Sequence, residues 1–262
     1  MNNSEPQKRL RFLARKYRRW CKNLDRLRLR LEGYDNSQPI LLEDYNAIYF
    51  QIPKIASTAI KKVLMKEMGV SGRAAHATRF PLMDPHKLNN GDYYDYFRFE
   101  FVRNPWARIA SCYRQKICRK ANINGGAWLR FLYYVTPDAW HLTFNKFLPT
   151  PILSSYMCFV EFVEAVAKIP DSRIDKHLRS QCQYLCGEDG ELLVSYLGRL
   201  ESFTEDFHHV AMRIGLPLDE PKNTARGKSP NFRTYYNQHT WDLVAARYRR
   251  DIELLGYSEC RL

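Results

Sequence analysis

The chain has 262 residues, of which 45% are hydrophobic and 14% aromatic, and this composition excludes an intrinsically disordered protein. It contains no run of about 18 apolar residues and no apolar stretch after its basic N-terminus, so we expect a cytoplasmic protein without a transmembrane helix or secretory signal. The formal net charge of +13 favours a polyanionic partner, and nucleic acid, anionic lipid and acidic glycan all remain open.

Residues 1–38 predict a basic helical arm, separate from a domain over residues 39–262. The first 32 residues hold eleven Lys or Arg residues and three acidic residues. Apolar residues recur here at spacings of three and four, which predicts an amphipathic helix; they are Leu10, Leu13, Tyr17, Trp20, Leu24, Leu27 and Leu31. Three roles for this arm stay open: packing on the domain, membrane-surface contact through residues 7–32, and formation of a homodimer.

Residues 46–62 predict a strand, a tight loop and a helix, in that order. The apolar, β-forming run ends at Pro53, which cannot donate a hydrogen bond to a strand ladder. Ser57 and Thr58 then lead into an apolar period typical of a helix. Because a helix N-terminus presents unpaired N–H groups and Lys54 adds a positive charge, the stretch indicates a phosphate site. The alternative is an ordinary turn with a surface lysine.

A second strand and helix follow farther along the chain. The β-forming run at residues 96–102 predicts a core strand. Asn104 is expected to cap the next helix and Pro105 to occupy its first position, so Arg103 lies at the junction. The apolar residues of this helix share one face, which we expect to be buried; they are Trp106, Ile109, Ala110, Tyr113 and Ile117.

The rest of the chain continues the alternation of strands and helices. We predict a helix over residues 159–169, a strand over 194–200, and helices over 203–214 and 239–255. An insertion of short helices is expected at residues 119–150 and a loop at residues 217–234. This order predicts an α/β fold with a mainly parallel sheet, flanked by helices, in a single domain.

The two cations at the ends of the predicted strands indicate a common ligand. In an open parallel sheet, ligands lie at the carboxyl ends of the strands. Lys54 and Arg103 are therefore expected to face one crevice. Two phosphate sites in one crevice suit a nucleotide that carries phosphate groups at two positions.

The residues around these cations resemble the motifs of a known family. Ile-Pro-Lys-Ile-Ala-Ser-Thr-Ala-Ile at residues 52–60 resembles the 5′-phosphosulfate loop of sulfotransferases that use 3′-phosphoadenosine 5′-phosphosulfate (PAPS). Phe-Val-Arg-Asn-Pro-Trp-Ala-Arg-Ile-Ala-Ser-Cys-Tyr-Arg at residues 101–114 resembles their 3′-phosphate motif, in the form typical of the carbohydrate branch. Weaker similarity, including His-Leu-Arg-Ser-Gln at residues 177–181, extends the match to residues 46–258. The resemblance implies a P-loop-like sheet without the Walker sequence.

The resemblance also implies which residues of the first motif bind the donor. The implied contacts are Pro53, Lys54, Ile55, Ala56, Ser57, Thr58 and Ala59. Lys54 is the catalytic residue among them, because it is placed to stabilise the bridging oxygen that leaves with the nucleotide. Ile55 and Ala56 replace the more common Thr-Gly or Thr-Ala pair, so this loop has one hydroxyl donor fewer.

Other basic residues are implied to bind the 3′-phosphate. Arg103 can bind it bidentately, with the Ser111 hydroxyl beside it. A third contact is expected from Arg226, or else from Lys228, in the late loop. Arg108 lies one turn before the serine, and it is either another phosphate ligand or part of a solvated helix face.

Sulfuryl transfer also requires a general base for the acceptor hydroxyl. His76 is the first candidate, because it follows the first strand and helix and the family often has a histidine there. A histidine near its usual pKa of about 6.5 can accept a proton at neutral pH. His177 is the second candidate and could instead contact the acceptor, and Glu201 is a third.

The cysteines predict neither a disulfide framework nor a metal site. Their number is odd, seven, in a chain of ordinary size. Cys182 and Cys186 are spaced to share a helix face, but a zinc site would need two further ligands with recognisable spacing. We expect buried free thiols and no metal.

Two other classes of function remain as alternatives. A P-loop kinase or NTPase would use ATP, but the chain has no Walker sequence and no magnesium-binding context. A basic polyanion-binding protein without catalysis would account for the charge, but no nucleic-acid-binding motif is recognised. We therefore expect a PAPS-dependent sulfotransferase with a carbohydrate or glycoconjugate acceptor and no nucleic-acid partner.

Overall fold

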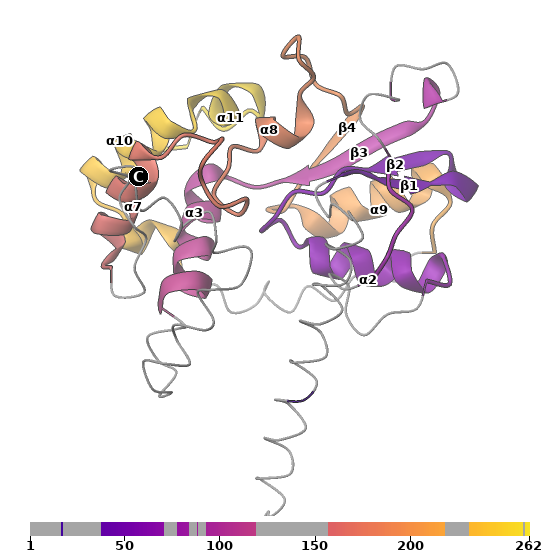
Figure 1. Ribbon diagram of the computed structural model, residues 1–262, viewed down its shortest axis with the longest axis horizontal. Coiled ribbons are helices and arrows are strands. Elements are labelled where there is room, and N and C mark those ends of the chain that lie inside the picture. Colours follow the sequence, from indigo (N-terminus) through magenta and orange to yellow (C-terminus); the bar gives the residue numbers. More distant parts are fainter. Residues whose placement is uncertain are drawn as a thin grey trace, which may run out of the picture.

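Short β-forming segments assemble into one mainly parallel sheet in the computed structural model (Figure 1). The structure describes residue 17 and residues 38–70, 78–83, 88, 93–118, 157–217, 231–258 and 260–262. Within these residues the strands lie in the order β1 (Ile40–Leu42), β2 (Ala47–Tyr49), β3 (Phe97–Val102) and β4 (Tyr196–Arg199). Strand β1 is antiparallel to β2, whereas β2, β3 and β4 are parallel. The predicted α/β class is confirmed.

Helices flank this sheet and follow its strands in sequence. The described α-helices are α2 (Ser57–Glu67), α3 (Pro105–Tyr113), α7 (Phe159–Lys168), α8 (Cys182–Leu185), α9 (Phe203–Ile214), α10 (Gln238–Arg247) and α11 (Arg249–Leu254). Shorter helical turns of other types lie at Glu43–Tyr45, Arg114–Cys118 and Phe232–Tyr235. The strands and helices predicted at residues 96–102, 159–169, 194–200 and 203–214 are confirmed.

Three details of the predicted elements are wrong. The single helix expected over residues 239–255 is two helices that meet at Tyr248, where φ is −113° and ψ is 27°. This residue is buried, and its hydroxyl donates to the Leu178 carbonyl at 2.5 Å, a contact that accompanies the break. The loop expected over residues 217–234 ends in a 3-10 turn. Strand β1 is not predicted, because three residues are too few to show a period.

Helices α9 and α2 cover opposite faces of the sheet. The ring of Phe101 in β3 packs against Phe203 and Phe207 of α9, with centroid distances of 5.1 and 6.4 Å. Successive strand residues point to opposite faces. Glu100 therefore points to the other face, where it interacts with Lys61 of α2. The apolar side chains of both faces are withdrawn from water.

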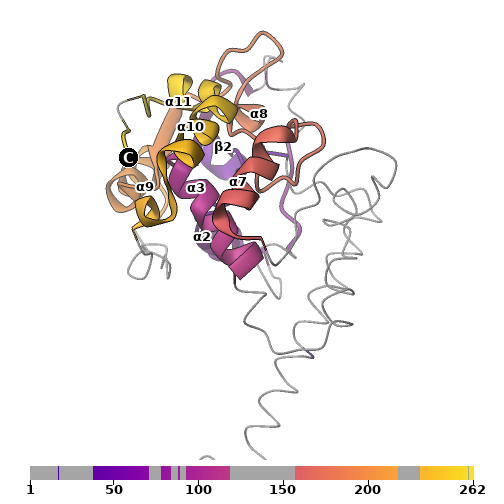
Figure 2. The same ribbon diagram turned by 90° about the vertical axis from the view of Figure 1, so that its left-hand side faces the viewer.

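A second hydrophobic cluster is built by helices α3, α7 and α10, which lie beside one another beyond the end of the sheet (Figures 1 and 2). At its centre the rings of Trp106 and Trp241 stack with centroids 4.4 Å apart. The predicted buried face of α3 is confirmed, since all five of its predicted residues are at most 9% exposed. Because α3 starts where β3 ends, this cluster fixes the direction in which α3 leaves the sheet.

A lysine and a glutamate are buried between α2 and the sheet. Lys61 is 2% exposed and Glu100 is fully buried. The pKa of Lys61 is lowered from 10.5 to about 8, mainly by burial and to a smaller extent by the charge of Lys176, while Glu100 opposes the shift. Burial also raises the pKa of Glu100 well above its usual range, although backbone N–H groups and Lys61 partly offset this. This region of the core therefore disfavours charge.

Replacing Lys61 by methionine is expected to raise the free energy of unfolding by about 1 to 3 kcal/mol at pH 7, because the burial cost of a charge is removed, while the raised pKa of Glu100 favours a neutral carboxyl that needs no counter-ion. In the folded protein the pKa of Lys61 is lowered to about 8, so its cost is fully present below that pH. The cost disappears as the pH rises towards 10.5, the ordinary value. Denaturant unfolding should show that the difference in the free energy of unfolding between variant and wild type becomes smaller from pH 7 to pH 10.

The control for this substitution is Lys62→Met, which changes an exposed lysine on the same helix. Its effect on stability should be small and independent of pH. A Lys61→Met effect that does not change with pH would contradict the interpretation.

Some predictions fall outside the described residues. The arm at residues 1–38 and the insertion at residues 119–150 are not described, apart from residues 17 and 38. None of the described helices is long and apolar enough to cross a membrane. Among the described cysteines, Cys112 and Cys182 are buried, as expected. Cys158, at the N-cap of α7, is an exposed free thiol, which differs from the expectation of burial.

Candidate functional site

The loop after β2 turns sharply before it enters α2. Lys54 has a φ of 77° and Ala56 a φ of 67°, which is a left-handed region that residues other than glycine rarely adopt. Between them, Ile55 is fully buried in the hydrophobic core of the sheet. The Ile55 side chain therefore fixes the loop to the hydrophobic core, at the position where the loops of the resembling sulfotransferases more often have a threonine.

The N-cap residue of α2 has no polar side chain to cap the helix. Ala56 occupies the N-cap position and makes no side-chain hydrogen bond, and the first turn holds no acidic residue. The first N–H groups of a helix have no partner within the helix, and the helix dipole is positive at this end. Ser57 is buried at this terminus, and Thr58 is exposed. The terminus is therefore suited to an anion.

The two predicted phosphate motifs meet at this loop. The Arg103 guanidinium donates from Nη1 to the Lys54 carbonyl at 3.4 Å. Arg108 donates from Nε to the Pro53 carbonyl at 3.3 Å. The Lys54 ammonium in turn donates to Oε1 of Gln115, which lies just after α3, at 2.5 Å. These contacts support the expectation that Lys54 and Arg103 face the same crevice.

The start of α3 is fixed by side-chain hydrogen bonds. The Asn104 side chain accepts from the backbone N–H of Ala107 at 3.1 Å, and Pro105 occupies the first helical position, as predicted. The Glu201 carboxylate accepts from the Asn104 backbone N–H at 2.9 Å and from the Tyr257 hydroxyl at 3.1 Å. Both oxygens of Glu201 thus accept hydrogen bonds from the protein, which gives this residue a structural role beside the site.

Arg103 is held in a place that disfavours its positive charge. The pKa of its guanidinium is lowered to about 10, mainly by burial; the Glu201 carboxylate opposes the shift, and the cations Arg114 and Arg108 contribute to it. Arg103 therefore remains protonated at neutral pH among other cations. A bound anion would offset both the burial and the repulsion, so these residues fit a phosphate group.

Ser111 and Arg108 lie on the buried side of α3. Ser111 is 6% exposed, two turns along the helix from Arg103. Arg108 is 1% exposed, and its Nη1 donates to the Arg179 carbonyl at 2.6 Å. The alternative of a solvated Arg108 is therefore wrong, because the guanidinium links the loop after β2 to the segment before α8. A direct contact of Arg108 with a phosphate stays a prediction.

His177 lies on the segment before α8 and is paired with a carboxylate. Its Nδ1 is 2.6 Å from Oδ1 of Asp175, which also accepts from the His177 backbone N–H at 2.8 Å. A carboxylate at Nδ1 fixes the orientation and tautomer of an imidazole ring. The same segment contacts Arg108 through Arg179. The structure therefore ties the segment of His177 to the phosphate motifs.

Other predicted site residues are not described, and some contacts were not predicted. His76, Arg226 and Lys228 lie outside the described residues, so their roles stay predictions. The sequence did not predict that Gln115 contacts Lys54 or that Gln181 contacts Arg103. Gln181 nevertheless ends the segment His-Leu-Arg-Ser-Gln that resembles the family. No group of three or more potential metal ligands occurs among the described His, Cys, Asp and Glu residues.

Comparison with known proteins matches nearly the whole domain to one family. The model described as "Sulfotransferase family" matches residues 38–258. Carbohydrate sulfotransferase 11 of Rattus norvegicus and of Mus musculus are each 30% identical over 112 residues, which is 38% of this chain and 32% of the relative. The Danio rerio protein of the same name is 32% identical over 93 residues, which is 30% of this chain and 26% of the relative. No solved structure matches.

Proposed function

The chain belongs to the sulfotransferase family, and on this premise we propose that it transfers a sulfuryl group from PAPS to a hydroxyl group of a carbohydrate. The observation that carries the proposal is the hydrogen bond of 3.4 Å from Arg103 to the Lys54 carbonyl. This contact between the two motifs supports a single ligand with anionic groups at two positions, as PAPS has. The carbohydrate acceptor is supported by the names of the curated relatives, of which the matched region spans about a third.

In the proposed donor site, the two motifs bind different parts of PAPS. The loop at residues 53–59 and the N-terminus of α2 bind the 5′-phosphosulfate through backbone N–H groups and hydroxyls. Lys54 stabilises the negative charge that develops on the bridging oxygen. Arg103 and Ser111 bind the 3′-phosphate, with charge-assisted hydrogen bonds from the guanidinium. Arg226 is the proposed third contact to that phosphate.

A histidine is proposed as the general base. His76 is the first candidate, on the resemblance to the family. The pairing of His177 with Asp175 supports the second candidate, because it orients the ring and favours proton acceptance at Nε2. Substitution of each histidine by glutamine, followed by pH profiles of kcat, would separate these two roles.

The proposal is tested by incubating the protein with PAPS and a panel of neutral and acidic oligosaccharides. A mass gain of one sulfuryl group on an oligosaccharide is the expected result. Calorimetry should show that 3′,5′-adenosine bisphosphate, the other product, binds more tightly than ATP with Mg²⁺. The reverse order would favour the alternative of a P-loop kinase.

Replacing Arg103 by alanine is expected to weaken the binding of 3′,5′-adenosine bisphosphate roughly 30- to 100-fold, because the guanidinium supplies charge-assisted hydrogen bonds to the 3′-phosphate. Binding of adenosine 5′-monophosphate, which has no 3′-phosphate, should change little. Titration calorimetry measures both affinities. The matched control is Arg249→Ala, which removes an exposed arginine that pairs with Glu253 on the surface. Equal losses for the two nucleotides would contradict the role given to Arg103.

A further inference from the structure

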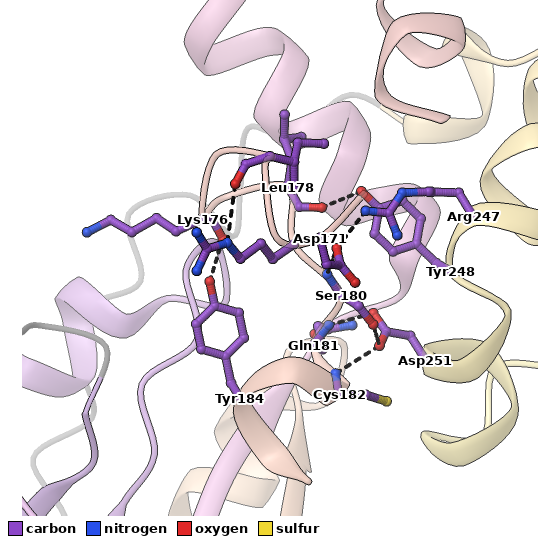
Figure 3. Close-up of polar contacts among 12 residues, drawn as sticks. Asp171, Lys176, Leu178, Ser180, Gln181, Cys182, Tyr184, Arg247, Tyr248 and Asp251 are labelled. Carbon is purple, nitrogen blue, oxygen red and sulfur yellow. Dashed lines mark hydrogen bonds and ion pairs between the residues drawn. The ribbon is translucent and has the colours of Figure 1, made fainter. Parts of the chain in front are cut away.

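A buried carboxylate in α11 organises the segment before α8. Asp251 is fully buried. Its carboxylate accepts from the Ser180 hydroxyl and from the backbone N–H groups of Gln181 at 2.7 Å and Cys182 at 2.9 Å (Figure 3). A carboxylate with several protein donors is stabilised in a buried position and holds its donors in place. Asp251 therefore fixes the backbone at residues 180–182.

Gln181 passes this constraint on to Arg103. The Gln181 side chain is also fully buried. Its Nε2 donates to the Arg103 carbonyl at 2.8 Å, and its Oε1 accepts from the Arg103 backbone N–H at 3.0 Å. Both backbone polar groups of Arg103 are thus bound by one side chain. The position of this backbone sets where the guanidinium begins.

These two hydrogen bonds from Gln181 to the Arg103 backbone, here called the backbone clamp, lie just beyond the end of the ladder between β3 and β4. The ladder between β3 and β4 ends with the pair Val102 and Arg199, followed by a hydrogen bond from Leu200 to the Val102 carbonyl at 2.8 Å. Arg103 is the next residue, beyond this ladder. Gln181 supplies hydrogen bonds to it that a neighbouring strand would otherwise provide.

Two further contacts fasten the same segment to the C-terminal helices (Figure 3). The Tyr248 hydroxyl donates to the Leu178 carbonyl at 2.5 Å. Arg247 pairs with Asp171 at 2.6 Å, and that aspartate also accepts from the Ser180 backbone N–H at 3.0 Å. The segment is thus held at several points. Among the described residues, only Gln181 forms side-chain hydrogen bonds to both the N–H and the carbonyl of Arg103.

We propose that Asp251 and Gln181 are positioning residues that set the preference of the donor site for nucleotides with a 3′-phosphate. This inference rests on the proposed function, because it assigns the 3′-phosphate to Arg103. Neither residue needs to touch the nucleotide. Displacing a binding group by about 1 Å can remove a large part of its contribution to binding. The backbone clamp can therefore affect nucleotide affinity without touching the ligand.

Two variants and a control test the proposal. Gln181→Met conserves length and removes both bonds to the Arg103 backbone, while the backbone N–H groups that bind Asp251 remain. Asp251→Asn conserves shape, but its amide nitrogen cannot accept the hydrogen bonds that the carboxylate accepts. Glu253→Gln changes an exposed carboxylate on the same helix, which pairs with Arg249 on the surface. For each protein, calorimetry gives the dissociation constants of 3′,5′-adenosine bisphosphate and adenosine 5′-monophosphate.

We expect the ratio of the two affinities to fall about tenfold in Gln181→Met and in Asp251→Asn, with less than about a twofold change for the monophosphate. Glu253→Gln should keep the wild-type ratio. An unchanged ratio in Gln181→Met, or equal losses for both nucleotides, would overturn the proposal. If Asp251→Asn does not fold, the result for Gln181→Met decides. A wild-type protein without preference for the bisphosphate would contradict the proposed function as well, whereas a preference that survives Gln181→Met contradicts only the positioning role.

Discussion

Replacing Lys54 by alanine is expected to lower kcat for sulfuryl transfer roughly 10²- to 10³-fold, with a smaller change in KM. The lysine follows β2 in the sharp turn before α2, and its own carbonyl accepts from Arg103 at 3.4 Å. Its ammonium is held at 2.5 Å from Oε1 of Gln115. In the proposed mechanism this cation acts on the charge that develops on the leaving oxygen, so it should contribute more to the transition state than to the ground state. Initial rates with PAPS and an accepted oligosaccharide measure the loss.

The backbone of Lys54 makes alanine a fair substitution. Its φ of 77° is unfavourable for any residue with a Cβ atom, so alanine adds no strain that lysine lacks. The unfolding midpoint should therefore stay close to that of the wild type. Lys62→Ala, which removes an exposed lysine of α2, is the matched control for the loss of one positive charge. A Lys54→Ala protein that keeps its kcat would contradict the role of the lysine at the leaving oxygen.

Replacing Trp106 by alanine is expected to lower the free energy of unfolding by about 3 to 5 kcal/mol, the range for a large aromatic residue lost from a core. The ring is 2% exposed and stacks on Trp241 at an interplanar angle of 15°. Its Nε1 donates to the Trp241 carbonyl at 3.0 Å. The substitution therefore removes packing and one buried hydrogen bond at the contact of α3 with α10. Denaturant titration followed by circular dichroism measures the change.

A graded series separates packing from hydrogen bonding at this position. Trp106→Phe retains an aromatic ring but loses the Nε1–H donor, so its cost should be smaller than that of alanine. Tyr94→Ala, which removes a side chain that is 76% exposed, should change stability little. If Trp106→Ala were as mild as Tyr94→Ala, the helical cluster would not depend on the tryptophan stack.

The elements that the sequence predicts best are those with local signals. The junction of β3 and α3 is an example, because a β-forming run, the cap Asn104 and the helix-starting Pro105 all lie within a few residues of one another. Helix α9 begins and ends where its apolar period predicts. The two phosphate motifs are likewise local patterns, and each falls at the predicted end of a strand. Local patterns thus place Lys54 and Arg103 at these junctions before any contact between the two motifs is known.

The contacts between distant segments could not be predicted in this way. Gln181 is separated by 78 residues from Arg103, and Asp251 by 70 residues from Gln181. Neither residue type nor spacing reveals such a pairing, because a buried glutamine or aspartate leaves no periodic trace in the sequence. The burial of Arg108 is hidden for the same reason, since an arginine on a helix is usually solvated. Tertiary contacts decided these details.

The clamp on Arg103 also has a consequence for the time at which the site can be completed during synthesis of the chain. A chain synthesised from its N-terminus exposes the loop after β2 and the start of α3 well before α11 leaves the ribosome. Asp251 can bind the Gln181 segment only after α11 has been synthesised, and contacts between such distant residues are slow to form because a long loop must first close. If Asp251 and Gln181 position Arg103 as proposed, the binding geometry of Arg103 is complete only after α11 has docked.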